Sequence, residues 1–135
     1  MPVISVVDDE IWVRESLDSL IRSIGHEVRV FASAEEFLNS AHRRKVDCLI
    51  LDVRLPGMSG IELHRHLLAR QCKVPVIFIT AHASDDRARS EAASDCTVVA
   101  HLIKPFTEDE LLGALATALN GNRAIHTTAE PRRSP

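Results

Sequence analysis

Acidic residues follow two short apolar runs of the sequence. Asp8 and Asp9 come directly after the run Val3–Val7, and Asp52 ends the run Cys48–Asp52. Continuous apolar runs of this length, bounded by turn signals, are typical of strands buried on both faces of a parallel sheet. Open α/β sheets carry their chemistry at the carboxyl ends of the strands. We therefore expect these carboxylates to lie close together, although a single acid after a strand is more often a turn former.

A cation is needed beside these carboxylates. Each pair of them within a few ångströms repels by roughly a few kcal/mol at an effective dielectric constant of about 20. Lys104, which follows another apolar run, is one candidate for the positive charge. Mg²⁺ is the other candidate, because it prefers oxygen ligands and takes one or two carboxylates together with water and phosphate.

This set of groups has a specific chemical use. A carboxylate can attack a phosphoryl group and become an acyl phosphate. Mg²⁺ and a lysine neutralise the phosphoryl oxygens during such a transfer. Thr80 ends the apolar run V-P-V-I-F-I-T, so its hydroxyl can hydrogen-bond a phosphate formed at the neighbouring strand end. The residue types therefore indicate phosphoryl transfer to a carboxylate.

Apolar runs alternate with segments of helical periodicity along the whole chain. Strands are expected at residues 3–7, 27–31, 48–52, 74–80 and 97–102, and helices at residues 13–24, 33–42, 59–70, 84–94 and 107–119. Capping boxes starting at Ser33, Ser59 and Thr107 mark three of the helix starts. The alternation predicts an α/β fold, in which a five-stranded parallel sheet is doubly wound by helices through right-handed crossovers. The fourth helix has only alanines as apolar residues, so we expect it to be thinly packed.

Composition limits the class of protein. A chain of 135 residues has the size of one domain, which we assign to residues 1–120, with residues 121–135 as a flexible tail or linker. The formal net charge of −3 argues against direct nucleic acid binding. We find no apolar run of membrane-spanning length and no signal peptide, and therefore expect a cytoplasmic protein without membrane contact. The three cysteines are expected to be reduced thiols.

Several short motifs, each weak alone, occur in a specific order and spacing. They read V-V-D-D-E, V-R-E-S-L, F-A-S-A-E-E-F-L, L-D-V-R-L-P-G-M-S-G, P-V-I-F-I-T-A-H and K-P-F. Over residues 3 to about 120, the sequence resembles the receiver domain of two-component response regulators, and within these the FixJ-like subgroup. The resemblance implies a flavodoxin-like or CheY-like three-layer fold. It also implies a phosphoacceptor signalling domain, whose only reactions are self-phosphotransfer and autodephosphorylation, rather than an enzyme.

The resemblance also implies a role for each acidic residue. Asp52 would be the phosphoacceptor, and a histidine kinase or a phosphotransfer protein would donate the phosphoryl group. Mg²⁺ would bind Asp9, Asp52 and the backbone carbonyl of Arg54 directly. Asp8 would contact the ion through water.

The same resemblance implies a switch. Thr80 would be the switch hydroxyl and Lys104 the phosphate partner, and the bond between Lys104 and Pro105 would be cis, which X-Pro bonds permit. Phosphorylation would shift the face built by the fourth helix, the fifth strand and the last helix. That face would control a partner, a homodimer contact or an output domain that this sequence does not contain.

One position departs from the family pattern. The family usually carries Phe or Tyr three residues before the lysine, and the orientation of that ring reports phosphorylation. His101 stands there in this sequence, so we expect an altered switch or output surface. Arg54 and His82, two residues beyond Asp52 and Thr80, are expected to tune the lifetime of the phosphate.

Two other functions fit parts of the sequence. An aspartyl-phosphate phosphatase on a similar sheet would need a second Asp two residues after the nucleophile, where this chain has Arg54. A degenerate interaction module that takes no phosphate is the alternative that His101 leaves open. The acidic pair, Asp52, Thr80 and Lys104 argue against that alternative.

Overall fold

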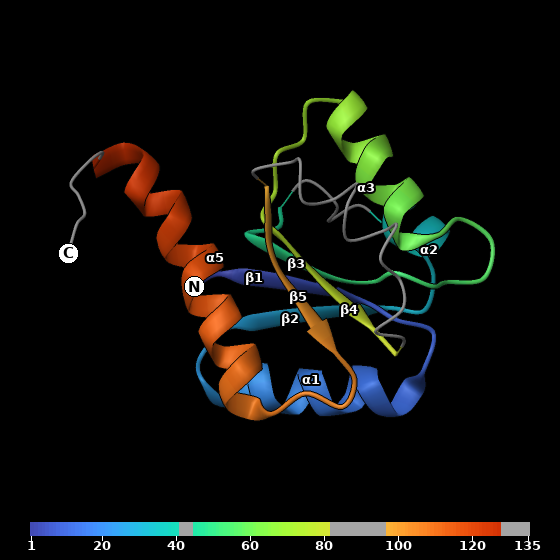
Figure 1. The fold of residues 1–135 in the computed structure, drawn as a ribbon, viewed down its shortest axis with the longest axis horizontal. Helices are drawn as coiled ribbons and strands as arrows, with labels where there is room; N and C mark the ends of the chain where they lie inside the picture. Colours follow the sequence, from blue (N-terminus) through green and yellow to red (C-terminus); the bar gives the residue numbers. More distant parts are fainter. Residues whose placement is uncertain (41–44, 82–96, 128–135) are drawn as a thin grey trace.

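The protein has one parallel sheet with helices on both faces (Figure 1). The computed structural model describes residues 1–40, 45–81 and 97–127, with backbone alone from residue 121. The strands lie in the order β2-β1-β3-β4-β5, and their bounds are β1 Val3–Val7, β2 Glu27–Phe31, β3 Cys48–Asp52, β4 Val76–Thr80 and β5 Val98–Ile103. The helices are α1 Ile11–Ser23, α2 Ala34–Leu38, α3 Gly60–Ala69 and α5 Glu108–Thr127. The predicted fold class is confirmed.

Two apolar clusters fill the space between the sheet and its helices. One lies under α1 and α5 and contains Leu17, Ile21 and Leu111. The other lies under α2 and α3 and contains Phe37 and Leu63. Every residue of β3 and β4 is buried, because helices cover both faces of the sheet at these strands. The carboxyl end of β3 is therefore held by packing on both sides.

Several boundaries differ from those that the sequence predicts. α2 ends at Leu38 rather than near residue 42, because the Ser40 amide turns back to the Phe37 carbonyl at 3.1 Å. β4 begins at Val76, since Pro75 has no N–H to donate to the sheet. α5 continues to Thr127 instead of ending near residue 120, because a glycine permits a helix end without forcing one. The expected helix at residues 84–94 lies outside the described residues.

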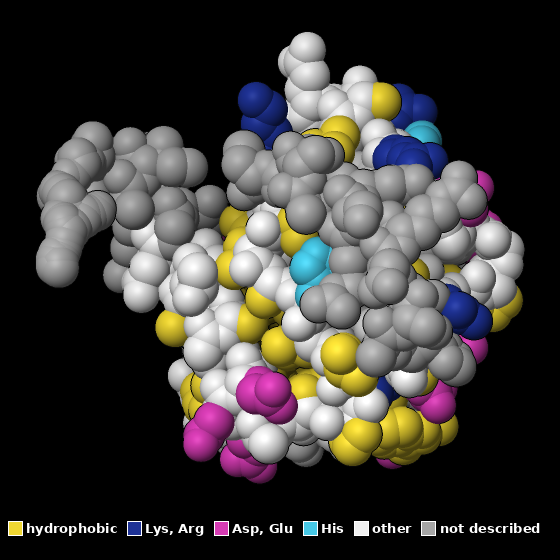
Figure 2. Space-filling model, viewed as in Figure 1, with side chains coloured by type: hydrophobic (Ala, Val, Ile, Leu, Met, Phe, Trp, Pro, Cys, Tyr) yellow, Lys and Arg dark blue, Asp and Glu magenta, His cyan; other side chains and the backbone are white. Residues whose placement is uncertain are grey.

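The start of α5 is capped as predicted. The Thr107 amide donates to Glu110 Oε1 at 2.8 Å, and the Glu110 amide donates to Thr107 Oγ1 at 3.0 Å. The first turn also contains Glu108 and Asp109, and Figure 2 shows acidic side chains gathered at this end of the helix. Acids there interact favourably with the helix dipole. Of the helices in the described ranges, not one combines the length and the apolar character that crossing a membrane requires.

The pairing of β4 with β5 contains one irregularity. Val76 pairs with Val98, but the next residue of β4 pairs with Ala100, so Val99 is an extra residue in β5. Val99 and Ala100 consequently both pack against the cluster under α1 and α5. This bulge decides which face of the sheet each later residue of β5 meets.

α1 ends in a Schellman motif built on a glycine. Gly25 has a φ of +95°, and its amide donates to Arg22 O at 3.0 Å. The amide of His26 donates to Ile21 O at 3.3 Å. These two hydrogen bonds satisfy carbonyls of the last turn, and glycine takes the left-handed conformation without a steric penalty.

α3 ends in the same motif with a different residue. Gln71 has a φ of +61°, and its amide donates to Leu68 O at 2.9 Å. The amide of Cys72 donates to Leu67 O, also at 2.9 Å. A side chain with a Cβ is strained in this left-handed conformation, so the end of α3 is less favourable than the end of α1.

We therefore expect Gln71→Gly to stabilise the protein by about 0.5–1 kcal/mol, because it relieves the left-handed strain without losing a hydrogen bond. Urea unfolding gives the free energy of unfolding. Arg70→Gly is the matched control, because Arg70 has a φ of −99° and gains nothing from glycine. A destabilised Gln71→Gly variant would contradict the expectation.

Candidate functional site

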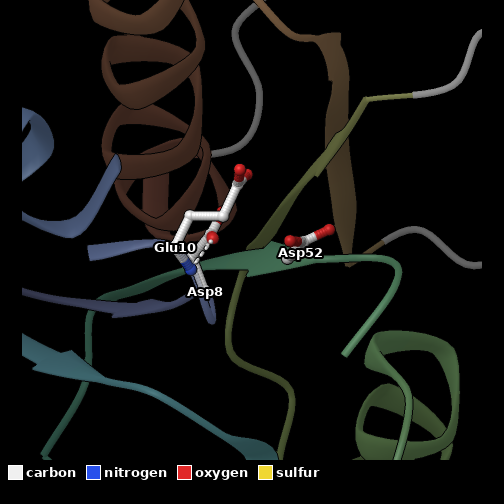
Figure 3. Close-up of side chains that lie close together, drawn as sticks. All are labelled: Asp8, Glu10 and Asp52. Atoms are coloured by element: carbon white, nitrogen blue, oxygen red, sulfur yellow. Dashed lines mark hydrogen bonds between the residues drawn. The ribbon is translucent and has the colours of Figure 1, made fainter. Parts of the chain in front are cut away.

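Three carboxylates surround one ammonium group at the carboxyl edge of the sheet. Lys104 Nζ lies 2.9 Å from Asp8 Oδ2, 2.8 Å from Glu10 Oε1 and 3.3 Å from Asp52 Oδ2. Asp8 follows β1, Asp52 ends β3 and Lys104 follows β5. Figure 3 shows the three acidic side chains beside one another at the strand ends. The topology thus brings together charges that are far apart in the sequence.

The turn after β1 is fixed by its own hydrogen bonds. The Asp8 amide donates to Phe31 O at 3.1 Å, which continues the pairing of β1 with β2. The Glu10 amide donates to Asp8 Oδ1 at 2.8 Å, as the dashed line in Figure 3 marks. Arg14 Nη1 donates to the Asp8 carbonyl at 2.7 Å. Asp8 is fully buried, so these contacts hold its carboxylate towards Lys104.

Asp52 is held by the backbone around it. The Val53 amide continues the sheet to Ile79 O at 2.9 Å, and the Arg54 amide donates to Asp52 Oδ1 at 3.1 Å. α3 begins against this segment, because the Gly60 amide donates to Val53 O at 3.0 Å. A Cβ on Gly60 would lie 2.1 Å from the Asp52 carbonyl oxygen. Only glycine allows α3 to start this close to the strand end.

The far side of the same loop is held by α2. The Met58 amide donates to Glu35 Oε2 at 2.9 Å. This backbone hydrogen bond lowers the pKa of Glu35. Gly57 forms the turn with a φ of +74°, and a Cβ there would lie 2.8 Å from Glu35 Oε2. The loop after Asp52 is thus tied to two helices.

The charges of the site change one another's acidity. Burial raises the pKa of Asp52 to about 6, with a further contribution from Asp8, and Lys104 only partly opposes this shift. Burial alone would lower the pKa of Lys104, but its hydrogen bond to Glu10 and the charges of Asp8 and Asp52 raise that pKa overall. The hydrogen bond from Lys104 lowers the pKa of Glu10. The lysine therefore stays charged, and the raised pKa of Asp52 makes its carboxylate easier to protonate than an ordinary aspartate.

The structure brings together most of the residues that the sequence singled out. Asp8, Asp52 and Lys104 are in direct contact, as described above. Thr80 is buried at the end of β4, where its carbonyl accepts from the Lys104 amide at 2.7 Å. The peptide bond between Lys104 and Pro105 is cis, as expected.

Other predicted residues lie differently. Asp9 is exposed and is not among the carboxylates gathered at Lys104. Arg54 contributes its amide to Asp52, while its side chain is exposed. His82 lies outside the described residues. His101 stacks on Phe78, with ring centroids 5.6 Å apart and planes 18° apart.

Phe78 also contacts a second histidine. His64, which is buried, meets Phe78 edge-on at 5.5 Å. Its Nε2 lies 3.0 Å from Thr97 Oγ1. The position of the family's aromatic switch is therefore occupied by a histidine that is packed into an aromatic stack linking α3, β4 and β5.

Glu10 is the site residue that the sequence analysis missed. It lies in the same turn as Asp8, and its carboxylate makes the shortest contact with Lys104. An acid directly following the acidic pair was visible in the sequence. The direction in which the Glu10 side chain points was not visible, because it depends on the hydrogen bond from the Glu10 amide to Asp8 Oδ1.

The donor set fits a hard divalent cation. One carboxylate oxygen from each of Asp8, Glu10 and Asp52 lies within 4.8 Å of the others. Carboxylate oxygens are the ligands that Mg²⁺ prefers, and the ion usually keeps several waters. The Asp/Glu/Asp cluster is therefore an acidic pocket of suitable chemistry.

A family comparison identifies this arrangement. The model of the response regulator receiver domain matches residues 4–116, which is most of the chain. The chain belongs to the response regulator receiver family. It is the receiver domain of a two-component signalling system.

Curated relatives agree with this assignment. The receiver domain is 45% identical over 117 residues to the response regulator protein TodT of Pseudomonas putida, covering 87% of this chain and 51% of that protein. It is 34% identical over 116 residues to the transcriptional regulatory protein FixJ of Bradyrhizobium diazoefficiens, covering 86% of this chain and 56% of FixJ. The similarity to FixJ agrees with the subgroup named from the sequence. The chain spans about half the length of these relatives.

A solved structure gives the same family. The response regulator TrrA of Thermotoga maritima, in complex with Mg²⁺-BeF, superposes with a TM-score of 0.72 at 29% identity. The match covers 88% of this chain and all of that one.

We expect Asp52→Asn to stabilise the metal-free receiver domain at about pH 7. The folded pKa of Asp52 is about 6, above the ordinary value of 3.8. The folded state therefore binds its proton more tightly, and stability falls as the pH rises from about 4 to about 6. A shift of this size corresponds to about 1–3 kcal/mol at neutral pH. Urea unfolding in a chelator, at several pH values, measures the gain.

The gain should shrink towards pH 4, where Asp52 is protonated and resembles asparagine. Asp9→Asn is the control, because Asp9 is exposed and its charge costs the folded state little. A variant no more stable than the wild-type protein at neutral pH would contradict the buried-charge explanation.

Proposed function

We propose that this receiver domain takes a phosphoryl group on Asp52 from a phosphohistidine of a histidine kinase or a phosphotransfer protein. The observation that carries the proposal is the contact of one ammonium with carboxylates from two strand ends, Asp8 and Asp52. A module that had lost phosphorylation would have no need to keep these charges together at a cost in desolvation.

The transfer follows from the groups present. A carboxylate oxygen of Asp52 forms the new bond to phosphorus, while the bond from phosphorus to the donor's histidine nitrogen breaks. The electron pair of that bond stays on the imidazole, which takes up a proton from solvent. Lys104, whose raised pKa keeps it charged, compensates the negative charge that arrives at Asp52.

The proposed ligands of Mg²⁺ are Asp9, Asp52 and the carbonyl of Arg54, with Asp8 acting through water. The acidic pocket of Asp8, Glu10 and Asp52 supports binding in this region. When bound, the ion would neutralise oxygens of the phosphoryl group. Arg54, whose side chain is exposed, and His82 are proposed to tune the lifetime of the phosphate.

The proposed switch uses Thr80. Its carbonyl accepts a hydrogen bond of 2.7 Å from the Lys104 amide, so Thr80 and Lys104 lie at the same edge of the sheet as Asp52. A hydrogen bond from the Thr80 hydroxyl to the phosphate would pull that side chain towards Asp52. The change would reach the face of the fourth helix, β5 and α5 through the stack that contains His101.

The domain would act in the cytoplasm. It would be phosphorylated and then recognised by a partner, rather than turn over a substrate. Residues 1–120 form the proposed receiver domain, with residues 121–135 as a tail or linker that begins as the end of α5. FixJ is a transcriptional regulatory protein by name. For this chain, we propose that the receiver domain likewise controls a transcriptional output.

Incubation with acetyl phosphate and Mg²⁺ should add one phosphoryl group to the intact mass. The adduct should be removed by hydroxylamine, since acyl phosphates react with it. Asp52→Asn should give no adduct, because the amide cannot form the mixed anhydride. An adduct of equal amount on that variant would contradict Asp52 as the acceptor. If hydrolysis is fast, tight binding of beryllium fluoride with Mg²⁺ replaces the adduct as the readout.

We also expect phosphorylation to promote homodimers through the face of the fourth helix, β5 and α5. Sedimentation velocity with and without beryllium fluoride measures the change in mass. Ile103, which is 41% exposed on β5, gives the test substitution Ile103→Glu, which should weaken the dimer. Ile24→Glu, at a similarly exposed position after α1, is the matched control. A fully activated sample that stays monomeric would contradict this proposal.

A further inference from the structure

We propose that Glu10 is a positioning residue that holds the Lys104 ammonium in the unphosphorylated domain and links that lysine to Trp12. This inference rests on the proposed phosphorylation of Asp52. Glu10 would compete with the phosphoryl group for the lysine, and its release would alter the surroundings of the tryptophan.

The distances favour Glu10 over Asp52 as the partner of the lysine. Lys104 Nζ lies 2.8 Å from Glu10 Oε1 and 3.3 Å from Asp52 Oδ2. The ammonium is therefore nearer to Glu10 than to the proposed acceptor. To contact a phosphoryl group on Asp52, it has to give up or share the bond to Glu10.

Burial makes Glu10 the exchangeable partner. The Asp8 side chain is fully buried, whereas that of Glu10 is 42% exposed. If the Asp8 carboxylate lost its contact with Lys104, no water could reach it to replace the ammonium as a hydrogen-bond donor. A released Glu10 carboxylate can turn to water, so exchanging it for phosphate costs little.

The second oxygen of Glu10 leads to the surface. Trp12 Nε1 donates to Glu10 Oε2 at 3.2 Å, and Trp12 is 56% exposed. The Glu10 backbone is anchored because its amide donates a hydrogen bond to Asp8 Oδ1, so the side chain is the part free to move. Movement of Glu10 away from Lys104 therefore changes the partner of the indole. Trp12 is the sole tryptophan in the sequence, so the tryptophan fluorescence of the protein comes from the residue that contacts Glu10.

The first test compares binding of beryllium fluoride with Mg²⁺ by isothermal titration calorimetry. Glu10→Gln removes the competing charge, and Glu10→Asp keeps the charge on a side chain one methylene shorter. Both variants should bind beryllium fluoride about two- to tenfold more tightly than the wild-type protein, the range of a partly exposed charged contact. Glu15→Gln removes the same charge from an exposed position on α1 and should leave the affinity unchanged.

The second test is Trp12 emission, recorded first with Mg²⁺ and then after beryllium fluoride is added. The wild-type protein should change its emission on the second addition. Glu10→Gln should lose most of that change, because the lysine no longer holds residue 10. A general loss of stability would not remove a fluorescence response from a domain that still binds the ligand.

Four outcomes overturn the inference. The Glu10 variants could bind beryllium fluoride like the wild-type protein. Glu10→Gln alone could bind more tightly, which would assign the effect to local charge. The emission change could persist in Glu10→Gln. Mg²⁺ binding could weaken in Glu10→Gln as much as in Asp9→Asn, which would make Glu10 a metal ligand instead. Failure of the wild-type protein itself to bind beryllium fluoride would reject the proposed function as well.

Discussion

The ammonium of Lys104 is the constraint on which the site depends. Two of its three carboxylate partners, Asp8 and Asp52, are almost fully buried. Their mutual repulsion is tolerated because one cation contacts both. Removing the cation from such a buried arrangement generally costs about 3–5 kcal/mol, since it leaves the carboxylates without compensation. Stability and chemistry are therefore linked through one side chain.

The scaffold brings this lysine to the acids by ordinary packing. β3 is central and buried, so Asp52 has little freedom at its end. The contact of α3 with the Asp52 backbone requires the missing side chain of Gly60. At the end of β4, the hydrogen bond from the Lys104 amide to the Thr80 carbonyl extends the pairing of β4 and β5 beyond the strands. The geometry of the sheet thus positions Asp52, Thr80 and Lys104, and the loops only complete the site.

Sequence patterns predicted the parts of this arrangement that repeat along the chain. Short strand-like segments and their turn signals identified all five strands, and strand ends in a parallel sheet had to bring Asp8, Asp52 and Lys104 together. What failed to follow depends on single turns. Consecutive side chains point to opposite sides at a strand end, which leaves Asp8 buried and Asp9 exposed. Glu10 reaches Lys104 because of one hydrogen bond in the turn, and no periodicity encodes that bond.

The bulge at Val99 separates Val98, the first residue of β5, from the rest of the strand, Ala100–Ile103. The part after the bulge leads to Lys104 and the site, whereas Val98 pairs with Val76 at the opposite end of β4. A change of one residue in chain length can be absorbed between them without rotating the lysine out of the pocket.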